Sequence, residues 1–416
     1  MNKSYLGNIG IALSTAIFLA ACGGGGSGTA TTTSYAGTIT GFGSVFVNGV
    51  EFDTTGSSIS VDGSSGTEND LKVGMQVTIK GSSNGSTGTA SSITFNDELE
   101  GLVISNSIAS GQLTGDMNIM GQTVTLTSTT IFESKISGVT TPDQITAGMI
   151  VEVSGFSSGT GSVQATRIEV KAADLASYIS MHAEGIEVKG IVSNLDTNNM
   201  TFDLGGITVD YAGASVSGFS NGIQDGLYVE VKSIQGLDTI TNNLVASEVE
   251  LENNGKKGHD SDGSSDVELK GLITTAVSGN TFVINGEVIT IDANTTFKNL
   301  KQSDLLLNVM VEVEASYING VLIAKEIELE SNSSSKAKGV VASVTSTAVN
   351  TGVVTLTDGT VISVTSSTIM KDSQDKGMTP VAKFNLSYLN QGDTVEIYYY
   401  DNNGTLTATK LERDDP

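Results

Sequence analysis

A strand–turn–strand pattern that recurs five times restricts the fold of this chain more than any other feature. Its clearest copy is the run 44–52 (SVFVNGVEF), in which two short alternating strands meet at Asn48-Gly49. A two-residue type I′ turn needs positive φ at both central residues, which Asn and Gly tolerate best. A turn dipeptide stands in the same setting at four further places: Met120-Gly121, Gly205-Gly206, Asn285-Gly286 and Asp358-Gly359.

Further signatures accompany each hairpin, so the chain divides into five units. Each unit opens on a glycine within an alternating strand, at Gly37, Gly101, Gly190, Gly271 and Gly339. A second strand signature follows later, represented in the first unit by 71–79 (LKVGMQVTI), and Asn308 replaces its glycine in the fourth unit. Each unit closes on an alanine three residues before an aliphatic residue, as Ala90 precedes Ile93.

One unit holds about five short strands, and their alternation predicts one buried and one solvated face. Closure into a small barrel buries the apolar face and removes exposed strand edges. The segment between the third and fourth strands suits one helical turn, for example at Pro142, because Pro is tolerated at a helix start. We therefore expect an all-β chain of five tandem OB-like five-stranded β-barrels, with a small sandwich per unit as the alternative.

The joints between the units complete the expected domain plan. Asp174 is a plausible N-cap before Leu175, Tyr178 and Ile179, which share one helix face, so a short linker helix is expected near 174–183. The plan is module 1 (35–99), module 2 (100–172), the linker helix (173–184), module 3 (185–252), an acidic flexible linker (253–266), module 4 (267–330), a linker (331–336) and module 5 (337–416).

The start of the chain has the features of a bacterial export signal. A cationic start and an apolar run from Ile9 to Ala21 end in small residues before Cys22, the only cysteine. This resembles a lipobox, which implies a signal peptide at 1–21, lipid on Cys22 and a Gly/Ser/Thr tether at 22–34. Gly23 in place of Asp favours the outer membrane, facing the periplasm or the cell surface. An ordinary secretory signal is the alternative.

These features together resemble a known family. The Gly-x-Ile opening at Gly37, the Asn48-Gly49 hairpin, the 74–79 strand and the closing Ala90-x-x-Ile93, behind a lipobox, are similar to tandem modules of the bacterial domain of unknown function 5666. The resemblance covers nearly all of 35–416 and implies OB-like barrels on an envelope lipoprotein. It implies no reaction.

The charge and the cysteine content exclude some partners. A formal charge of -25 makes nucleic acid an improbable partner, because phosphate binding needs clustered Lys and Arg. With Cys22 as the single cysteine, no intramolecular disulfide can form. The membrane, reached through the lipid on Cys22, is the expected contact, together with an unidentified protein or glycan.

A calcium site is one candidate for bound metal. Asp260, Asp262 and Asp266 stand at spacings that resemble the first half of a calcium loop, but no Glu occupies the bidentate position. A solvated linker is the plainer interpretation, and no other cofactor is expected. The two histidines, His182 and His259, are too few for a usual zinc site.

Catalysis is not expected, because no nucleophile, base and orienting group converge in the sequence. Carboxylates alternate at Glu248 and Glu250, at Glu312 and Glu314, and at Glu326 and Glu328, which indicates solvated strand faces rather than a hydrolase pair. The best aromatic contact surface is Tyr398-Tyr399-Tyr400, where alternation points one ring opposite the other two.

The expected function is therefore that of a lipid-anchored, non-catalytic envelope protein that acts as a binding or structural module. A calcium- or small-ligand-binding periplasmic protein and an envelope hydrolase are the alternatives.

Overall fold

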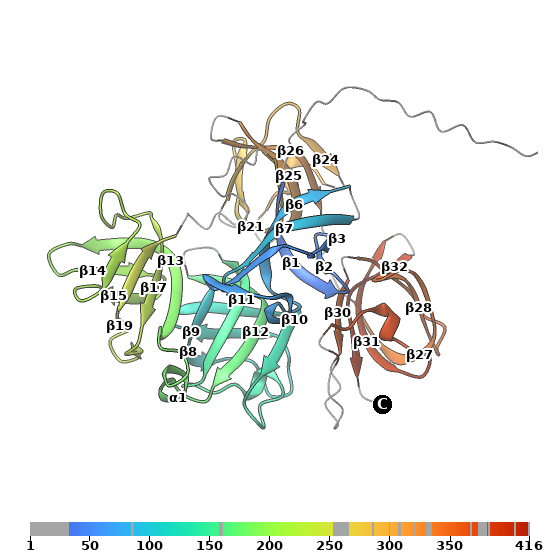
Figure 1. Cartoon of the computed structure of the whole chain (residues 1–416), viewed down its shortest axis with the longest axis horizontal. Coiled ribbons are helices and arrows are strands. Elements are labelled where there is room, and N and C mark those ends of the chain that lie inside the picture. The colour runs from blue at the N-terminus through green and yellow to red at the C-terminus, as the bar shows by residue number, and fades with distance from the viewer. Residues whose placement is uncertain are drawn as a thin grey trace, which may run out of the picture. The chain divides into compact units, whose positions relative to one another are not determined.

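The fold was obtained as a computed structural model, shown in Figure 1. It describes residues 33–84, 87–157, 161–252, 266–284, 287–298, 300–306, 309–318, 321–329, 335–366, 368–372, 381, 383–402 and 405–414. The expected signal peptide and Cys22 lie outside these residues. The described chain is almost entirely β-structure, as expected.

Module 1 is a closed five-stranded barrel. Its strands are β1 (Thr33–Phe42), β2 (Val45–Val47), β3 (Val50–Asp53), β6 (Gln76–Ser83) and β7 (Thr87–Phe95). They pair in the order β1-β2-β3-β7-β6, and β6 pairs back with β1. The third strand pairs in parallel with the fifth, so the barrel has the Greek-key connection of the OB-fold.

The other modules repeat this order. Their strands are β8 (Leu99–Asn106), β9 (Gly115–Ile119), β10 (Gln122–Ser134), β11 (Ile150–Ser157) and β12 (Ser162–Ala172) in module 2; β13 (Ile186–Asp196), β14 (Thr201–Leu204), β15 (Ile207–Asp210), β17 (Tyr228–Ser233), β19 (Asn243–Val245) and β20 (Glu248–Leu251) in module 3; β21 (Asp266–Ser278), β22 (Thr281–Ile284), β23 (Glu287–Thr290), β25 (Met310–Ile318) and β26 (Val321–Leu329) in module 4; and β27 (Ser335–Ala348), β28 (Thr351–Leu356), β29 (Val361–Val364), β31 (Thr394–Asn402) and β32 (Thr405–Asp414) in module 5.

The rings of modules 2, 4 and 5 close through parallel pairing of the third and fifth strands. In module 3 the fifth strand is split into β19, which pairs with the third strand, and β20, which pairs with the fourth. Because the strands of a module close into a ring, the modules are barrels and not sandwiches. Strands β21 and β27 begin inside the expected linkers, since they already include Asp266, Ser335 and Lys336.

Short elements fill the connections between the long strands. Between the third and fourth strands stand the expected helical turns, which are 3-10 helices in modules 1, 2, 4 and 5. They are η1 (Glu68–Asp70), η2 (Pro142–Gln144), η3 (Gln302–Asp304) and η4 (Leu386–Tyr388). The remaining short strands are β4 (Ser58–Val61), β5 (Ser64–Gly66), β16 (Ser215–Ser217), β18 (Leu237–Asp238), β24 (Thr296–Lys298) and β30 (Ile369–Asp372).

The predicted hairpin turns are confirmed in the first three modules. Asn48 and Gly49 have φ of 51° and 78°, and Val47 pairs with Val50 across them. The turns at 120–121 and 205–206 are equally tight. The turn at 285–286 lies outside the described residues. In module 5 the loop is longer, because Thr355 is the residue that pairs with Val361.

The predicted linker helix is also present. It is α1 (Leu175–Ile179), shorter than expected, and Asp174 caps it by accepting a 2.8 Å hydrogen bond from the Ser177 backbone N–H. The Tyr178 ring is buried and stacks on His182, with ring centroids 4.4 Å apart. His182 is therefore a packing partner of this helix.

Four of the five first strands also pair with the first strand of another module. β8 pairs antiparallel with β13, which joins modules 2 and 3, and β1 pairs in parallel with β21, which joins modules 1 and 4. Modules 2 and 3 share one hydrophobic cluster, to which Leu99 and Val188 both belong. Modules 1, 4 and 5 each have a cluster of their own; that of module 4 also includes Ala36 of β1.

Candidate functional site

The outer faces of the barrels carry side chains in a register that all five modules share, and these side chains are polar except at the buried Ala36 of module 1. We define a first row of three residues in each module. It consists of the residue before the opening glycine, the residue that pairs with it on the fourth strand, and the residue on the fifth strand that pairs with that one. The first rows are Ala36–Thr78–Thr94, Glu100–Glu152–Glu169, Lys189–Glu230–Glu250, Lys270–Glu312–Glu328 and Lys338–Glu396–Glu412 in modules 1 to 5.

The carboxylate pairs seen in the sequence lie on these faces. In module 4, Glu314 pairs with Glu326 beside the first row, and both stand on strands that also carry the core. The side chain of Glu312 is 24% exposed and that of Glu326 is 25% exposed. The carboxylates therefore line a partly solvated strand face, and their spacing follows from strand alternation.

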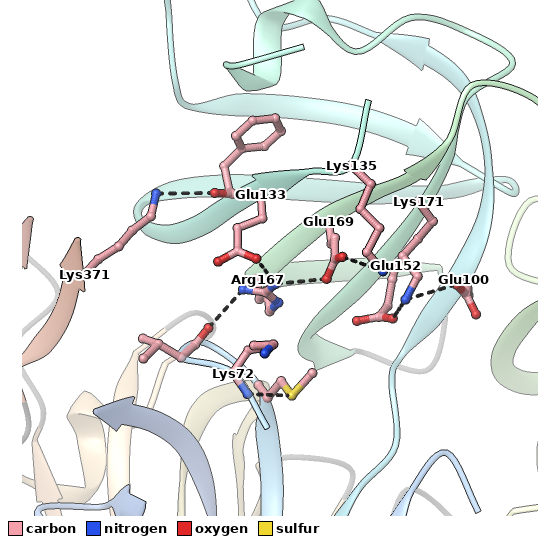
Figure 2. A network of polar contacts seen from close by, with 12 residues as sticks. Lys72, Glu100, Glu133, Lys135, Glu152, Arg167, Glu169, Lys171 and Lys371 are labelled. Carbon is pink, nitrogen blue, oxygen red and sulfur yellow. Dashed lines mark hydrogen bonds and ion pairs between the residues drawn. The ribbon is translucent and has the colours of Figure 1, made fainter. Parts of the chain in front are cut away.

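In module 2 the polar face includes a buried arginine, Arg167, whose contacts Figure 2 shows. The Arg167 side chain is 1% exposed, and its Nη2 lies 2.7 Å from Glu133 Oε2 and 2.9 Å from Glu169 Oε2. Its Nη1 donates to the backbone oxygen of Val73 in module 1 at 3.4 Å. Burial alone would raise the pKa of Glu169, but Arg167 and Lys171 outweigh it and lower the pKa to about 2. This pair is a strong structural contact.

Lys171 neutralises the acidic first row of module 2. Its Nζ contacts Glu152 and lies 3.7 Å from Glu100 Oε1, as Figure 2 shows. Burial nevertheless raises the pKa of Glu100 to about 7. The Lys that stands on the first strand in modules 3, 4 and 5 is thus replaced in module 2 by one at the end of the fifth strand.

Module 3 buries its first-row lysine completely. Lys189 is 5% exposed, and its Nζ lies 2.5 Å from Glu187 Oε1 and 3.3 Å from Glu230 Oε2. It also donates to the backbone oxygen of Asp97, between modules 1 and 2, at 2.8 Å. Ion pairing therefore joins this strand to the connection between the first two modules.

Module 5 differs from the others in its second row, which lies beside the first row and two residues away from it on each strand. That row is Lys336–Tyr398–Lys410, with the tyrosine between two lysines. The Lys336 and Lys410 Nζ atoms lie 5.5 Å and 5.7 Å from the centroid of the Tyr398 ring. The Tyr398 hydroxyl donates to Glu396 Oε1 at 2.8 Å. Cation–π contacts and a charge-assisted hydrogen bond fix this ring.

Lysines and carboxylates alternate around this row. Lys410 is 6% exposed and pairs with Glu412 at 2.9 Å, while Lys371 on β30 lies 3.2 Å from the other oxygen of Glu412. Burial would raise the pKa of Glu412, but these two lysines outweigh it and lower the pKa to about 2. Lys371 also donates to the backbone oxygen of Phe132 in module 2 at 3.3 Å, as Figure 2 shows.

A cavity of about 630 Å³ opens on the Tyr398 side of module 5. Its polar wall includes Lys371, Glu396, Tyr398, Lys410 and Glu412. Hydroxyl and apolar groups from module 2 also line the cavity, among them Thr127, Thr130, Leu126, Phe132 and Val139. The cavity is large enough for a small organic ligand, and it offers donors, acceptors and apolar surface together.

The three consecutive tyrosines at 398–400 were predicted to point to alternate faces of their strand. Tyr398 lines the cavity, whereas Tyr399 packs against the core of module 5, so alternation placed these two rings on opposite faces as predicted. The side chain of Tyr400 lies outside the described residues. Lys336, Lys371 and Lys410 were missed, although in modules 2 to 5 a Lys or Glu stands directly before the opening glycine and a Glu stands four residues after the closing alanine.

The predicted calcium ligands cannot be compared with the structure. Asp260, Asp262 and the side chain of Asp266 lie outside the described residues. Within the described part of the chain, no three His, Cys, Asp or Glu side chains are placed to share a metal ion. The described helices also include none that is long and apolar enough to cross a membrane.

The family whose description reads Domain of unknown function (DUF5666) matches five stretches of the chain, at residues 36–94, 100–169, 189–250, 270–328 and 338–412. Each stretch coincides with one barrel. None of the curated proteins matches the chain.

Proposed function

The chain belongs to the DUF5666 family, and on that premise we propose that it is a non-catalytic ligand-binding protein of the cell envelope, anchored through lipid on Cys22. The five barrels share one scaffold, while the residues on their outer faces change from module to module. A scaffold that holds its strands fixed and varies its surface suits binding. Module 5 carries the ligand site in this proposal.

The observation that supports this proposal is the position of Tyr398 at the cavity. Its ring is held between Lys336 and Lys410, and its hydroxyl is held by Glu396. At the same position in modules 3 and 4 stand Lys232 and Glu314, which carry no ring. A pre-positioned tyrosine costs little conformational entropy on binding, because its side chain is already ordered.

The chemistry of the cavity favours a saccharide that carries charged substituents. Its polar wall offers ammonium, carboxylate and hydroxyl groups, and Phe132 and Val139 offer apolar surface. Sugar rings present hydroxyl groups at their edges and C–H groups on their faces, so they match a cavity of this mixed character.

Calorimetric titration of the full chain tests the site. The probes are a disaccharide–peptide muropeptide, which is charged, and N,N′,N″-triacetylchitotriose, which is an uncharged chain of N-acetylated amino sugars. Tyr398→Ala is expected to weaken binding about tenfold or more, because stacking and hydroxyl contacts are lost. Tyr388→Ala, which removes an exposed tyrosine that does not line the cavity, is the matched control. Absence of heat with both probes would overturn the proposal.

The anchor is tested separately by metabolic labelling with an alkyne-bearing fatty acid. Label is expected on the wild-type chain and is expected to be lost in Cys22→Ala, since the chain has no other thiol. Equal labelling of both chains would show that the lipid is not attached at Cys22.

A further inference from the structure

The contact between modules 2 and 3 has a local two-fold symmetry. Leu99 and Val188 lie directly opposite each other in the antiparallel β8–β13 pair, and each stands two residues before the opening glycine of its module. Glu100 on one strand faces Glu187 on the other, which continues the same relationship. Equivalent strand segments of two modules thus contact each other through the same residues, which is the geometry of an isologous interface.

The first strand of module 4 is used in a related way. Residues Ser34 to Ala36 of β1 pair with Val267 to Leu269 of β21, so each of the two strand pairings between modules uses the starts of two first strands. With four modules engaged in two pairs, module 5 is the one left over. Among the described strands, β27 pairs only with β28 and β31 of its own barrel.

The exposure of equivalent residues also distinguishes module 5 from the other modules. Leu99 and Val188 are 0% exposed, and Tyr35, at the equivalent position of module 1, is buried. In module 5 the equivalent residue is Ala337, which is only half-buried, and its neighbours Lys336 and Lys338 are exposed. An unpaired strand edge is a template for another strand, and the Lys on each side of Ala337 must be neutralised for this edge to pair.

We propose that β27 pairs antiparallel with β27 of a second copy of this chain, with Ala337 opposite Ala337 on the two-fold axis. The register repeats that of Leu99 and Val188, so Lys336 of one copy faces Lys338 of its partner. Each lysine already lies beside a carboxylate of its own module, since Lys336 pairs with Glu396 and Lys338 with Asp414. These carboxylates offset the repulsion between the facing lysines.

A second copy is the expected partner because, among the described strands, both strand pairings between modules join first strands of two modules. The dimer also extends the ligand face. The second rows of the two copies, each with its Tyr398, would lie on one continuous sheet, and Lys338 of one copy would extend the Lys336–Tyr398–Lys410 row of the other.

Disulfide trapping tests the register. In the full chain with Cys22→Ala, Ala337→Cys introduces the only thiol. Residues that face each other across an antiparallel pair have Cα atoms about 4.5–5.5 Å apart, within the range for a disulfide. Mild oxidation is expected to link two copies at least about tenfold more efficiently than in the control Thr345→Cys, which places the thiol on an exposed part of the same strand.

Sedimentation of the Cys22→Ala chain without other substitutions keeps the test independent of the new thiol. The expected mass is twice the 42.8 kDa of one chain. A monomer at all concentrations, or equal cross-linking of Ala337→Cys and Thr345→Cys, would overturn the proposal. An acidic peptide that occupies the edge instead of a second copy would give a monomer in this experiment and so counts against it.

Discussion

Gly74 of module 1 lies directly against Arg167 of module 2. A Cβ added to Gly74 would come within 3.0 Å of the Arg167 Cβ and within 2.9 Å of the Thr166 backbone oxygen. The Thr166 hydroxyl donates to the Gly74 backbone oxygen at 2.6 Å, so the turn at Gly74 is held against strand β12. The glycine of the repeated strand signature has thus gained a second role here, as a close contact between barrels.

The substitution Gly74→Ala is therefore expected to destabilise the fold more than the same change at Gly148. Both glycines have positive φ, of 91° and 97°, so an alanine costs about 1–2 kcal/mol at either position. A Cβ at Gly148 meets no atom within 4 Å, whereas at Gly74 overpacking adds about 1–3 kcal/mol. Chemical denaturation measures both variants. Equal losses would show that Gly74 does not contact module 2 in solution.

Lys189→Met is expected to destabilise the chain strongly. The substitution removes the buried cation from Asp97, Glu187 and Glu230, of which only the two glutamates retain a second cation among the described residues, Lys232. Losing one partner of a buried pair costs about 3–5 kcal/mol. Lys338→Met is the matched control, because it removes the equivalent first-row lysine where its side chain is 56% exposed; the cost there is about 1 kcal/mol or less. Similar unfolding midpoints for the two variants would contradict the buried position of Lys189.

The unfolding temperature is expected to be highest near pH 5. Burial raises the pKa of Asp62 to about 6 and the pKa values of Glu100 and Glu252 to about 7. The folded chain binds these protons more tightly than the unfolded chain, so stability rises as pH falls from about 7 to about 4.5. Glu169 and Glu412 have folded pKa values of about 2, so their stabilisation is lost below about pH 4.5.

Thermal melts over pH 3–8 measure this profile. Asp62→Asn removes one of the raised groups, so the gain between pH 7 and pH 5 is expected to become smaller in this variant. A stability that rises steadily from pH 5 to pH 8 would contradict the burial of these carboxyls.

Arg413→Lys is expected to loosen module 5 even though the charge is retained. Arg413 Nε donates to Asp372 Oδ1 at 2.9 Å and Nη2 donates to Oδ2 at 2.8 Å, and the Asp372 side chain is fully buried. Lysine cannot form this two-point contact, so about 1.5–3 kcal/mol is expected to be lost. Denaturation of Lys338→Arg, a charge-preserving change at an exposed position, is the control. Equal stability of both variants would rule out the two-point contact.

Much of the fold could be predicted because its signals are local. Asn48-Gly49 specifies a tight turn through its own backbone preferences, and Asp174 specifies a helix start through its own side chain. Alternation placed Tyr398 and Tyr399 on opposite faces. Each of these outcomes depends on residues within a few positions of one another, so a single sequence contains them.

The rest depends on which modules meet, and local patterns carry no such information. Lys189 and Lys338 stand at equivalent positions, yet one is buried and the other exposed, because only the first lies under the connection at Asp97. The neighbours of Tyr398, Lys336 and Lys410, come from other strands, and their approach follows from the register of the barrel. The sequence alone therefore shows which residues are charged but not which of them lie next to one another.

Closure of each barrel through the third and fifth strands has a consequence for the order of folding. In module 1, Glu51 pairs with Thr87, so the third strand cannot pair with the fifth until that strand, much later in the chain, has been synthesised. Such non-local pairing is slow, and the waiting strand exposes an edge that can aggregate. During synthesis, each barrel can be completed only after its last strand has emerged, and modules 2 and 3, which share one core, have to mature together.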